Sequence, residues 1–428
     1  SYGVGVHHAG LSDDVRMLME WLFEHGELRF LVATTTIAQG VNFPVSGVVM
    51  ASHQYPYGEN MPPEDFWNIA GRAGRMGHGD LGVVALASDS DERTSTLRLF
   101  VDQQTGDLNS ALIEMARDAQ GLLADLGKIV YSRPEWSAFL QYLAHTYQQM
   151  GKPDTFGDEI EQVLRNTFGF ATLRTHEPHL ARALLAGVHA YADYICEPNQ
   201  PLKLVDSTGF SLQSIRSAMA QSRESGITKD SWERATLFSY GDNSLQAMMG
   251  VLMRIPELRN NLEDVLGAGR TNGDKLARIL KDWVNGSSVE SIARQYFMEG
   301  ETSYIEAVTK CGQNLSGKLT QTTAWGLGAL LAITGGELSD SRLNEVRNLP
   351  SQVYYGVNSD EAVVFRLLGI PRMAALEMAR NQPDLASGPV ASVRTRLREL
   401  DDSGWSAACS VSAASVYRQV WRVMEGLD

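Results

Sequence analysis

The chain has 428 residues, 43% of them hydrophobic, and a formal net charge of −14. A chain of this size can bury large cores and is expected to hold two to four domains. Its three cysteines, Cys196, Cys311 and Cys409, lie far apart, which argues against a disulfide framework or a zinc cluster. The sequence has neither a signal peptide nor an apolar run of membrane-spanning length, so we expect a reducing, cytoplasmic compartment and no membrane partner.

The acidic balance also constrains nucleic-acid binding. A basic surface is the usual footprint of such proteins, because neutralising phosphates releases counterions. At a net charge of −14, a uniformly basic surface is excluded. Any contact with nucleic acid is expected in a narrow basic channel, supported by backbone amides and hydroxyls.

The first hundred residues alternate short apolar runs with helix signals. Residues 5–9 are typical of a short strand and its loop. Ser12 is expected to cap a helix that has Asp13 and Asp14 in its first turn and ends at Gly26. Further strands are predicted at residues 30–33, 47–51 and 81–87. Strands without polar alternation, separated by helices, indicate an α/β lobe whose parallel sheet is covered on both faces.

After about residue 95 the pattern becomes helical. Apolar spacing predicts helices over residues 109–130, 134–149, 158–168, 180–195, 211–222, 243–255, 275–283, 289–296 and 322–333, with others later. Pro198, Pro201 and the glycine-rich stretch 267–273 are the expected breaks.

Two segments of this helical part imitate nucleotide-binding motifs. Residues 312–318 have the glycine spacing of a phosphate loop, but Leu319 stands where a magnesium-binding hydroxyl is required, and the stretch is predicted to be helical. Asp360 and Glu361 look like an acidic box, but Ser359 before them is expected to be a helix N-cap. We interpret both resemblances as chance.

Three segments near the N-terminus carry the most specific signal. They read Val-His-His-Ala-Gly-Leu over residues 6–11, Ala-Thr-Thr-Thr-Ile-Ala-Gln-Gly-Val-Asn-Phe-Pro over residues 33–44, and Asn-Ile-Ala-Gly-Arg-Ala-Gly-Arg over residues 68–75. In this order they resemble the motifs of the second motor lobe of superfamily 2 helicases, in the superkiller-type (Ski-like DExH) branch. The resemblance is dense over roughly residues 4–88 and thin beyond them.

The resemblance implies a partial RecA-like lobe over residues 1–100, with a sheet incomplete at its N-terminal side. It further implies a helical, winged-helix region over 101–210, a ratchet-like helical bundle over 211–345 and a C-terminal helical domain over 346–428. Residues 367–375 in this last part resemble a helix–hairpin–helix element, although a short helix turn explains them equally well.

The implied reaction is ATP hydrolysis coupled to movement along single-stranded nucleic acid, DNA in preference to RNA. A helicase motor needs a phosphate loop and a magnesium-binding acidic box, and we expect both on a separate N-terminal lobe. This chain alone is therefore expected to hydrolyse no ATP and to hold neither ATP, Mg²⁺ nor any other metal.

Two arginines are the predicted catalytic residues. Arginine fingers pair bidentately with the γ-phosphate as its charge builds, which lysine cannot imitate. Arg72 and Arg75 are expected on one side of a helix, where Gly71 and Gly74 leave room for a phosphate. Asn68 replaces the glutamine that is usual in the family, and its amide is expected to reach the nucleotide.

The other predicted contacts lie in the first two segments. By resemblance, Thr34 and Thr35 touch the nucleic-acid backbone, and Gly40 and Asn42 face the nucleotide. His8 lines the nucleic-acid track. Hydroxyls and amides in such a loop suit a sugar-phosphate backbone, which carries no sequence information.

Three weaker candidates lie in the helical part. Trp283 and Trp325 are either stacking platforms for bases or core residues. The arginines of residues 393–398 either contact phosphates or line a solvated helix face.

Other interpretations stay open. A helicase-derived scaffold would dock a protein partner through the helical half, and a split enzyme would receive its first lobe from another chain. An RNA helicase is a third alternative, and the sequence leaves the polarity and the pathway open.

Overall fold

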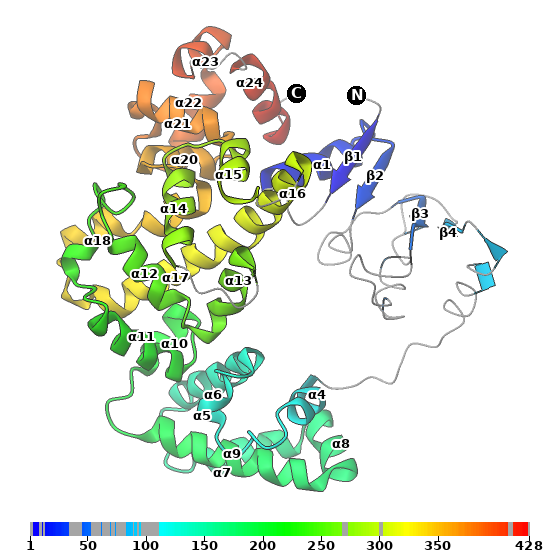
Figure 1. Ribbon diagram of the computed structural model, residues 1–428, viewed down its shortest axis with the longest axis vertical. Helices are drawn as coiled ribbons and strands as arrows, with labels where there is room; N and C mark the ends of the chain where they lie inside the picture. Colours follow the sequence, from blue (N-terminus) through cyan, green and yellow to red (C-terminus); the bar gives the residue numbers. More distant parts are fainter. Residues whose placement is uncertain are drawn as a thin grey trace. The chain divides into compact units, whose positions relative to one another are not determined.

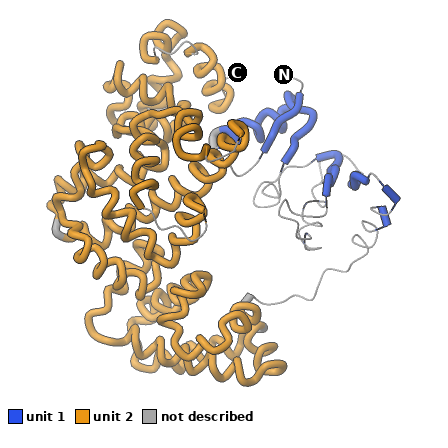
Figure 2. The backbone as a smooth tube through the Cα atoms, in the orientation of Figure 1, with its two compact units in different colours: residues 1–109 blue, residues 110–428 orange. Residues whose placement is uncertain are grey.

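The computed structural model divides the chain into two compact units, residues 1–109 and 110–428 (Figure 2). It describes residues 3–7, 11, 13–33, 45–52, 61, 69, 73, 83–88, 90–91, 94–95, 111–267, 273–298, 303–409 and 414–426. A parallel α/β part followed by a mainly helical part confirms the predicted fold class in this coarse form.

The first unit opens with a strand–helix–strand arrangement (Figure 1). Strand β1 (Val4–His7) pairs in parallel with β2 (Phe30–Ala33), and helix α1 (Asp13–Glu24) connects them. Gly26 adopts a φ of 76°, a left-handed conformation that ends the helix where the sequence predicted.

A second parallel pair joins β3 (Gly47–Met50) to β4 (Val83–Leu86). The described strands thus form two sheets of two strands each. Burial on both faces was predicted, but Phe30 is 66% exposed and Val49 is 74% exposed. The prediction is therefore wrong for these faces of the described strands.

One local prediction needs a correction. We expected a helix over residues 68–75, and Ile69 is helical, but Ala73 forms an isolated parallel bridge with Val45. Gly71 and Gly74 explain the difference, since each costs about 1 kcal/mol relative to alanine inside a helix. Pairing gives the main chain of Ala73 a partner on the neighbouring segment instead.

The second unit begins with a layer of helices. These are α4 (Ala111–Asp118), α5 (Leu126–Ile129), α6 (Ser137–Gln149), α7 (Phe156–Arg165), α8 (Phe168–His176), α9 (Pro178–Cys196) and α10 (Leu202–Thr208). The predicted helix over residues 109–130 is broken, because Gly121 takes a φ of 90°. No strand occurs in residues 111–267, so the described part of this layer contains no β-wing.

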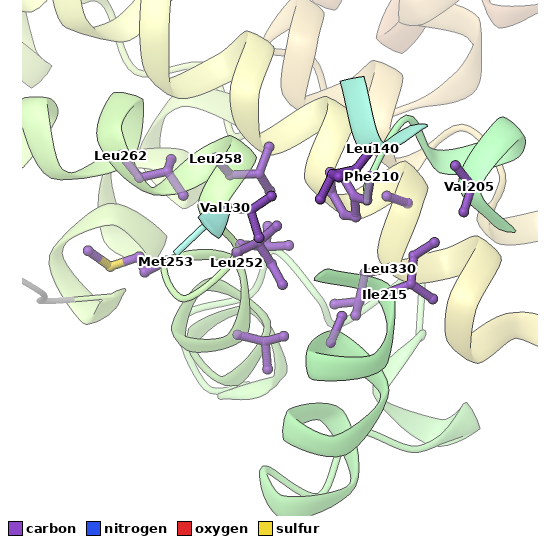
Figure 3. Packing of buried hydrophobic residues seen from close by; sticks show 14 of the residues in the cluster. Val130, Leu140, Val205, Phe210, Ile215, Leu252, Met253, Leu258, Leu262 and Leu330 are labelled. Atoms are coloured by element: carbon purple, nitrogen blue, oxygen red, sulfur yellow. The ribbon is translucent and has the colours of Figure 1, made fainter. Parts of the chain in front are cut away.

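A bundle continues from this layer. It contains α11 (Leu212–Glu224), α12 (Ser244–Leu252), α13 (Pro256–Leu266), α14 (Gly273–Val284), α15 (Val289–Tyr296), α16 (Tyr304–Asn314), α17 (Gln321–Thr334), α18 (Asp340–Val346) and α19 (Leu349–Tyr355). One apolar core extends from Ile113 to Val353 and joins the bundle to the preceding layer. Figure 3 shows part of this core, where side chains such as Val130, Leu252 and Leu258 point toward one another.

A small C-terminal module has a core of its own. Its helices are α20 (Asp360–Leu367), α21 (Arg372–Asn381), α22 (Val390–Glu399), α23 (Asp402–Ala408) and α24 (Ala414–Met424). The rings of Trp405 and Trp421 lie 5.6 Å apart at its centre, and both residues are buried. No helix in the described part of the chain is long and apolar enough to cross a membrane.

The two segments that imitate nucleotide motifs are helical, as predicted. Residues 312–318 lie in α16 and in the π-helical segment η4 (Leu315–Thr320), and Lys318 Nζ donates to Asp264 Oδ2 at 2.7 Å. Ser359 caps α20, and its Oγ accepts from the Ala362 main-chain N–H at 3.2 Å. Neither segment offers a phosphate loop or an acidic box.

Candidate nucleic-acid interface

The predicted catalytic and binding residues of the first unit lie outside the described residues. They are His8, Thr34, Thr35, Gly40, Asn42, Asn68, Gly71, Arg72, Gly74 and Arg75. Their roles stay predictions.

The described backbone next to them is informative. His7 pairs with Ala33 at the carboxyl ends of the parallel strands β1 and β2, and His8 and Thr34 follow directly in the sequence. Ligands of parallel α/β sheets commonly bind at the carboxyl ends of strands. The register thus brings together the two strand ends from which the first two motifs continue.

A second backbone contact lies beside the second and third motifs. Val45 directly follows the threonine-containing segment 33–44, and Ala73 lies within the arginine-containing segment 68–75. These two residues form a parallel bridge, so the residue that follows the threonine-containing segment meets the main chain of Ala73.

A buried histidine in this region has a structural partner. His7 is 2% exposed, and its Nε2 lies 2.9 Å from Oε1 of Glu20 on α1. This pair was not predicted from the sequence. Of the two adjacent histidines, His7 thus fixes α1 against its strand.

The second unit contains one continuous helical run from Tyr304 to Thr334, formed by α16, η4 and α17 (Figure 1). π-Helical segments within α-helices occur frequently at functional sites. Helix α17 packs against α10, α11, α12, α13 and α19, so its buried side is well supported.

The opposite side of this run is accessible. Gln321 and Trp325 are exposed, and Gly317 and Gly328 are partly exposed. A spacing of three or four residues places these side chains on one helix face. Glycines there leave the backbone open to close approach by a ligand.

Polar anchors hold the edge of this face. Lys318 bonds to Asp264 of α13, Thr322 Oγ1 lies 3.2 Å from Asn261 Nδ2 of α13, and Trp325 bonds to α10. The three anchored side chains are spaced i, i+4 and i+7. The helix is thus fixed in rotation by its neighbours.

The two candidate tryptophans differ sharply. Trp283 is 9% exposed, and its Nε1 donates to the Val353 carbonyl at 3.0 Å. The Arg372 Cζ atom lies 3.8 Å from the centroid of the Trp283 ring. A Cβ on Gly356 would lie 2.2 Å from Cε2 of the same ring. Trp283 is therefore a core residue. Trp325 is 42% exposed and keeps an accessible ring.

Arg372 connects the C-terminal module to the bundle. Its guanidinium donates to the main-chain carbonyls of Trp283, Ser287 and Gly356, which lie at the C-terminal ends of α14 and α19. Burial lowers the pKa of Arg372 to about 10, so it stays charged at neutral pH. A cation at two helix C-termini is favourable, because both helix dipoles are negative there.

The C-terminal arginines are engaged within the module. Arg394 and Arg398 pair with the two carboxylate oxygens of Glu425, at 3.4 and 2.6 Å. Arg396 donates to the main-chain carbonyls of Leu385 and Ser387. These contacts favour the interpretation as a structural helix face over phosphate binding.

The turn between α20 and α21 contains the residues that resemble a helix–hairpin–helix element. The main-chain N–H groups of Leu368, Gly369 and Ile370 all bond to carbonyls of α20. Pro371, the next residue, has no N–H. The main-chain N–H groups of residues 368–370 are thus occupied in capping the C-terminal end of α20.

Comparisons with known proteins agree with the motif analysis. Residues 1–77 match the family model described as helicase conserved C-terminal domain. The chain is 25% identical over 441 residues to "ATP-dependent DNA helicase Hel308" of Caldivirga maquilingensis, covering 94% of this chain and 54% of that protein.

Two further relatives match different shares of the chain. The first, "Putative helicase 7" of Sulfolobus islandicus filamentous virus (isolate Iceland/Hveragerdi), is 24% identical over 88% of this chain and 54% of its own length. The second, "mRNA transport homolog 4" of Caenorhabditis elegans, is 29% identical over 39% of this chain and 16% of its own length. The chain thus spans about half the length of the viral and Caldivirga relatives. The domain match and these relatives together support a superfamily 2 helicase.

Proposed function

We propose that this chain is the second motor lobe and the helical accessory region of an ATP-dependent, superkiller-type helicase that moves along single-stranded DNA. One observation carries the proposal: the helicase match over residues 1–77 spans all three motif segments. The relatives that align over 88% and 94% of the chain extend the likeness into the helical region.

The nucleotide chemistry is assigned to the first unit, a partial RecA-like lobe. Arg72 and Arg75 pair with the terminal phosphate oxygens of ATP, because planar guanidinium groups match their geometry. A separate N-terminal lobe supplies the phosphate loop and the Mg²⁺ ligands. The bridge between Val45 and Ala73 supports the assignment of nucleotide contacts to the first unit, since it pairs the residue after segment 33–44 with a residue of segment 68–75.

Further contacts complete the proposed nucleotide cleft. They come from Gly40, Asn42, Asn68, Gly71 and Gly74. Glycines permit the close approach of a phosphate, and the two amides supply polar contacts.

The DNA track starts at the ends of β1 and β2, where His8, Thr34 and Thr35 contact the sugar-phosphate backbone. In the second unit, a further DNA contact is assigned to the exposed face of α17, where Trp325 stacks on a base. Such a track needs few positive charges, which fits a chain with a net charge of −14. DNA is preferred over RNA because the Caldivirga relative is described as a DNA helicase. The finer division at about residues 210 and 345 belongs to this proposal.

A mutation in the whole enzyme tests the proposal. Arg75→Ala should reduce DNA-stimulated ATP turnover at least a hundredfold while DNA binding stays near normal, since arginine fingers contribute about 10³-fold or more to turnover. Arg380→Ala is the matched control, because that side chain is 74% exposed. The 428-residue chain alone should hydrolyse no ATP.

Three results would overturn or redirect the proposal. Normal turnover in the Arg75→Ala enzyme removes the finger assignment. A whole protein without nucleic-acid-stimulated ATPase activity indicates the scaffold instead. Stimulation by RNA but not by DNA changes the substrate.

A further inference from the structure

The contact between strand β1 and its covering helix changes from apolar to polar at the carboxyl end of the strand. A Cβ placed on Gly5 would lie 2.6 Å from Leu28 Cδ1 and 3.4 Å from Met19 Sδ of α1, so apolar side chains fill that space. His7 lies two residues further on and therefore faces the same side of the sheet. There its buried Nε2 lies 2.9 Å from Oε1 of Glu20 on α1.

The carboxylate of Glu20 selects one tautomer of the His7 ring. A carboxylate only accepts hydrogen bonds, so Nε2 carries the proton and donates to it. Nδ1 is then an acceptor, and among the described residues it has no hydrogen-bond partner. The Glu20 side chain is 24% exposed and keeps some contact with solvent. A single bond therefore sets both the orientation of the buried ring and the nitrogen that carries its proton.

Stability alone does not explain a polar pair at this position. The net contribution of a hydrogen bond to stability is small, because folding exchanges it for bonds to water. Apolar side chains such as those around Gly5 pack a helix onto a strand equally well. A hydrogen bond adds direction, since it weakens steeply when donor and acceptor are misaligned. What the pair supplies beyond packing is a fixed position of α1 at the end of the strand.

The place of this bond matters for the two neighbouring motifs. His7 pairs with Ala33 in the parallel register, so β1 and β2 end at the same level. His8 and Thr34 are the next residues of the two strands in sequence. The bond to α1 thus holds the last residue of β1 directly before the first of them.

We infer that Glu20 is a positioning residue for DNA binding, which acts through His7 on the strand ends that lead into His8 and Thr34. The inference rests on the proposed function, because that function assigns DNA-backbone contacts to His8 and Thr34. Glu20 itself contacts no substrate. Loss of its carboxylate leaves the apolar contact at Gly5 in place, but it frees the end of β1 from the helix.

The test measures ATP turnover by the whole enzyme as a function of the concentration of oligo-dT. Glu20→Met keeps helix propensity and side-chain volume but removes the acceptor. It should raise the DNA concentration for half-maximal stimulation about fivefold, the size expected when one hydrogen bond no longer holds a contact in place. Turnover at saturating DNA should stay within about twofold of wild type, because the arginine fingers are unchanged. Glu20→Gln keeps an acceptor oxygen and should restore the wild-type DNA concentration.

Two single variants are the matched controls. Glu24→Ala removes an exposed carboxylate one turn further along α1 and should leave the half-maximal DNA concentration unchanged. Leu28→Ala removes a buried apolar side chain beside Gly5 and should lower the Tm through the cavity that it leaves. Its half-maximal DNA concentration should nevertheless match wild type, since the bond between His7 and Glu20 remains.

A double variant separates positioning from stability. His7→Leu should raise the half-maximal DNA concentration as much as Glu20→Met does. The two changes together should raise it no further, because either one already removes the same hydrogen bond. The double variant replaces the polar pair by an apolar one, so its Tm should return toward that of wild type while DNA stimulation stays weakened.

The possible failures point to different errors. A whole enzyme that no nucleic acid stimulates refutes the proposed function itself. If oligo-dT stimulates wild type and Glu20→Met at equal concentrations, the proposed function stands and the positioning role is wrong. An equal rise in Leu28→Ala attributes the effect to lost stability, and additive effects in the double variant show that Glu20 does not act through His7. Either result overturns the inference.

Discussion

The carboxylate of Glu257 holds three helix N-termini together, and removing it should destabilise the second unit strongly. Oε1 accepts from Ser137 Oγ at 2.5 Å and from the Ser211 N–H at 2.8 Å, while Oε2 accepts from Ser214 Oγ at 2.6 Å. Ser137 begins α6, Ser211 caps α11, and Glu257 lies in the first turn of α13. A carboxylate is favoured there, because the positive ends of three helix dipoles meet.

The magnitude follows from the groups left behind in Glu257→Ala. The Ser211 N–H is buried and would lose its acceptor, at a cost of about 1–3 kcal/mol. Ser137 and Ser214 would each lose a bond to a charged group, but Ser214 keeps a contact with Ser211 Oγ at 2.9 Å. The expected loss is about 4 kcal/mol for Glu257→Ala and about 2 kcal/mol for Glu257→Gln, which keeps an acceptor oxygen.

Thermal unfolding followed by circular dichroism measures this loss. For a unit spanning residues 110–428, an unfolding entropy of about 2.1 cal/mol/K per residue converts 4 kcal/mol into a fall in Tm of roughly 6 °C. Glu290→Ala is the control, because this residue is 58% exposed and pairs only with Arg294 on its own helix, so its Tm should change by less than about 1 °C. A Glu257→Ala protein that melts within 1 °C of wild type, or a control that falls equally, refutes the reasoning.

Two further predictions concern an inter-domain contact and pH. Arg372→Lys should lower the free energy of unfolding by about 2 kcal/mol and speed proteolytic release of the C-terminal module, because an ammonium cannot span three carbonyls and stack on Trp283. Arg380→Lys is the exposed control. Equal rates of proteolysis for the two variants would contradict the role of Arg372 in joining the module to the bundle. A hydrogen bond from His189, and to a smaller extent one from Arg165, lowers the pKa of Glu161 in the folded protein below its ordinary value of 4.5. The contribution of Glu161 to folding stability is therefore fully present above pH 4.5 and is lost as the pH falls through the pKa of the folded protein. The Tm of Glu161→Gln should therefore depend less on pH below 4.5 than that of wild type. If the Tm values of the two proteins fall equally steeply with pH in this range, the effect is disproved.

Much of the local structure could be predicted from the sequence, because apolar runs and helix caps act between residues that are close in the chain. Continuous apolar runs predicted β2 and β3, and the helix over residues 289–296 has the predicted bounds. Ser359 before two acidic residues predicted a helix start, since a side-chain oxygen satisfies an N–H of the first turn. Gly121 and Ala73 marked the limits of this reasoning: a left-handed glycine divided one predicted helix, and a long-range bridge replaced part of another.

The candidate site was predictable only in part. The motif residues of the first unit were identified by resemblance, and their roles stay predictions. The support of the α17 face could not be identified in this way, because Trp325 bonds to a main-chain carbonyl that leaves no signature in side-chain sequence. Trp283 and Trp325 were equivalent candidates in the sequence, although only one of them has an accessible ring.

The amino-acid sequence by itself predicted a superfamily 2 helicase and the position of most helices and strands, since motif spacing, apolar periodicity and caps act over a few residues. Only the tertiary structure decided which tryptophan is buried, because Arg372 and Gly356 reach Trp283 from distant parts of the chain. It also decided that Glu257 joins three helix ends, because its partners lie 43 to 120 residues away and folding alone brings them within hydrogen-bonding distance.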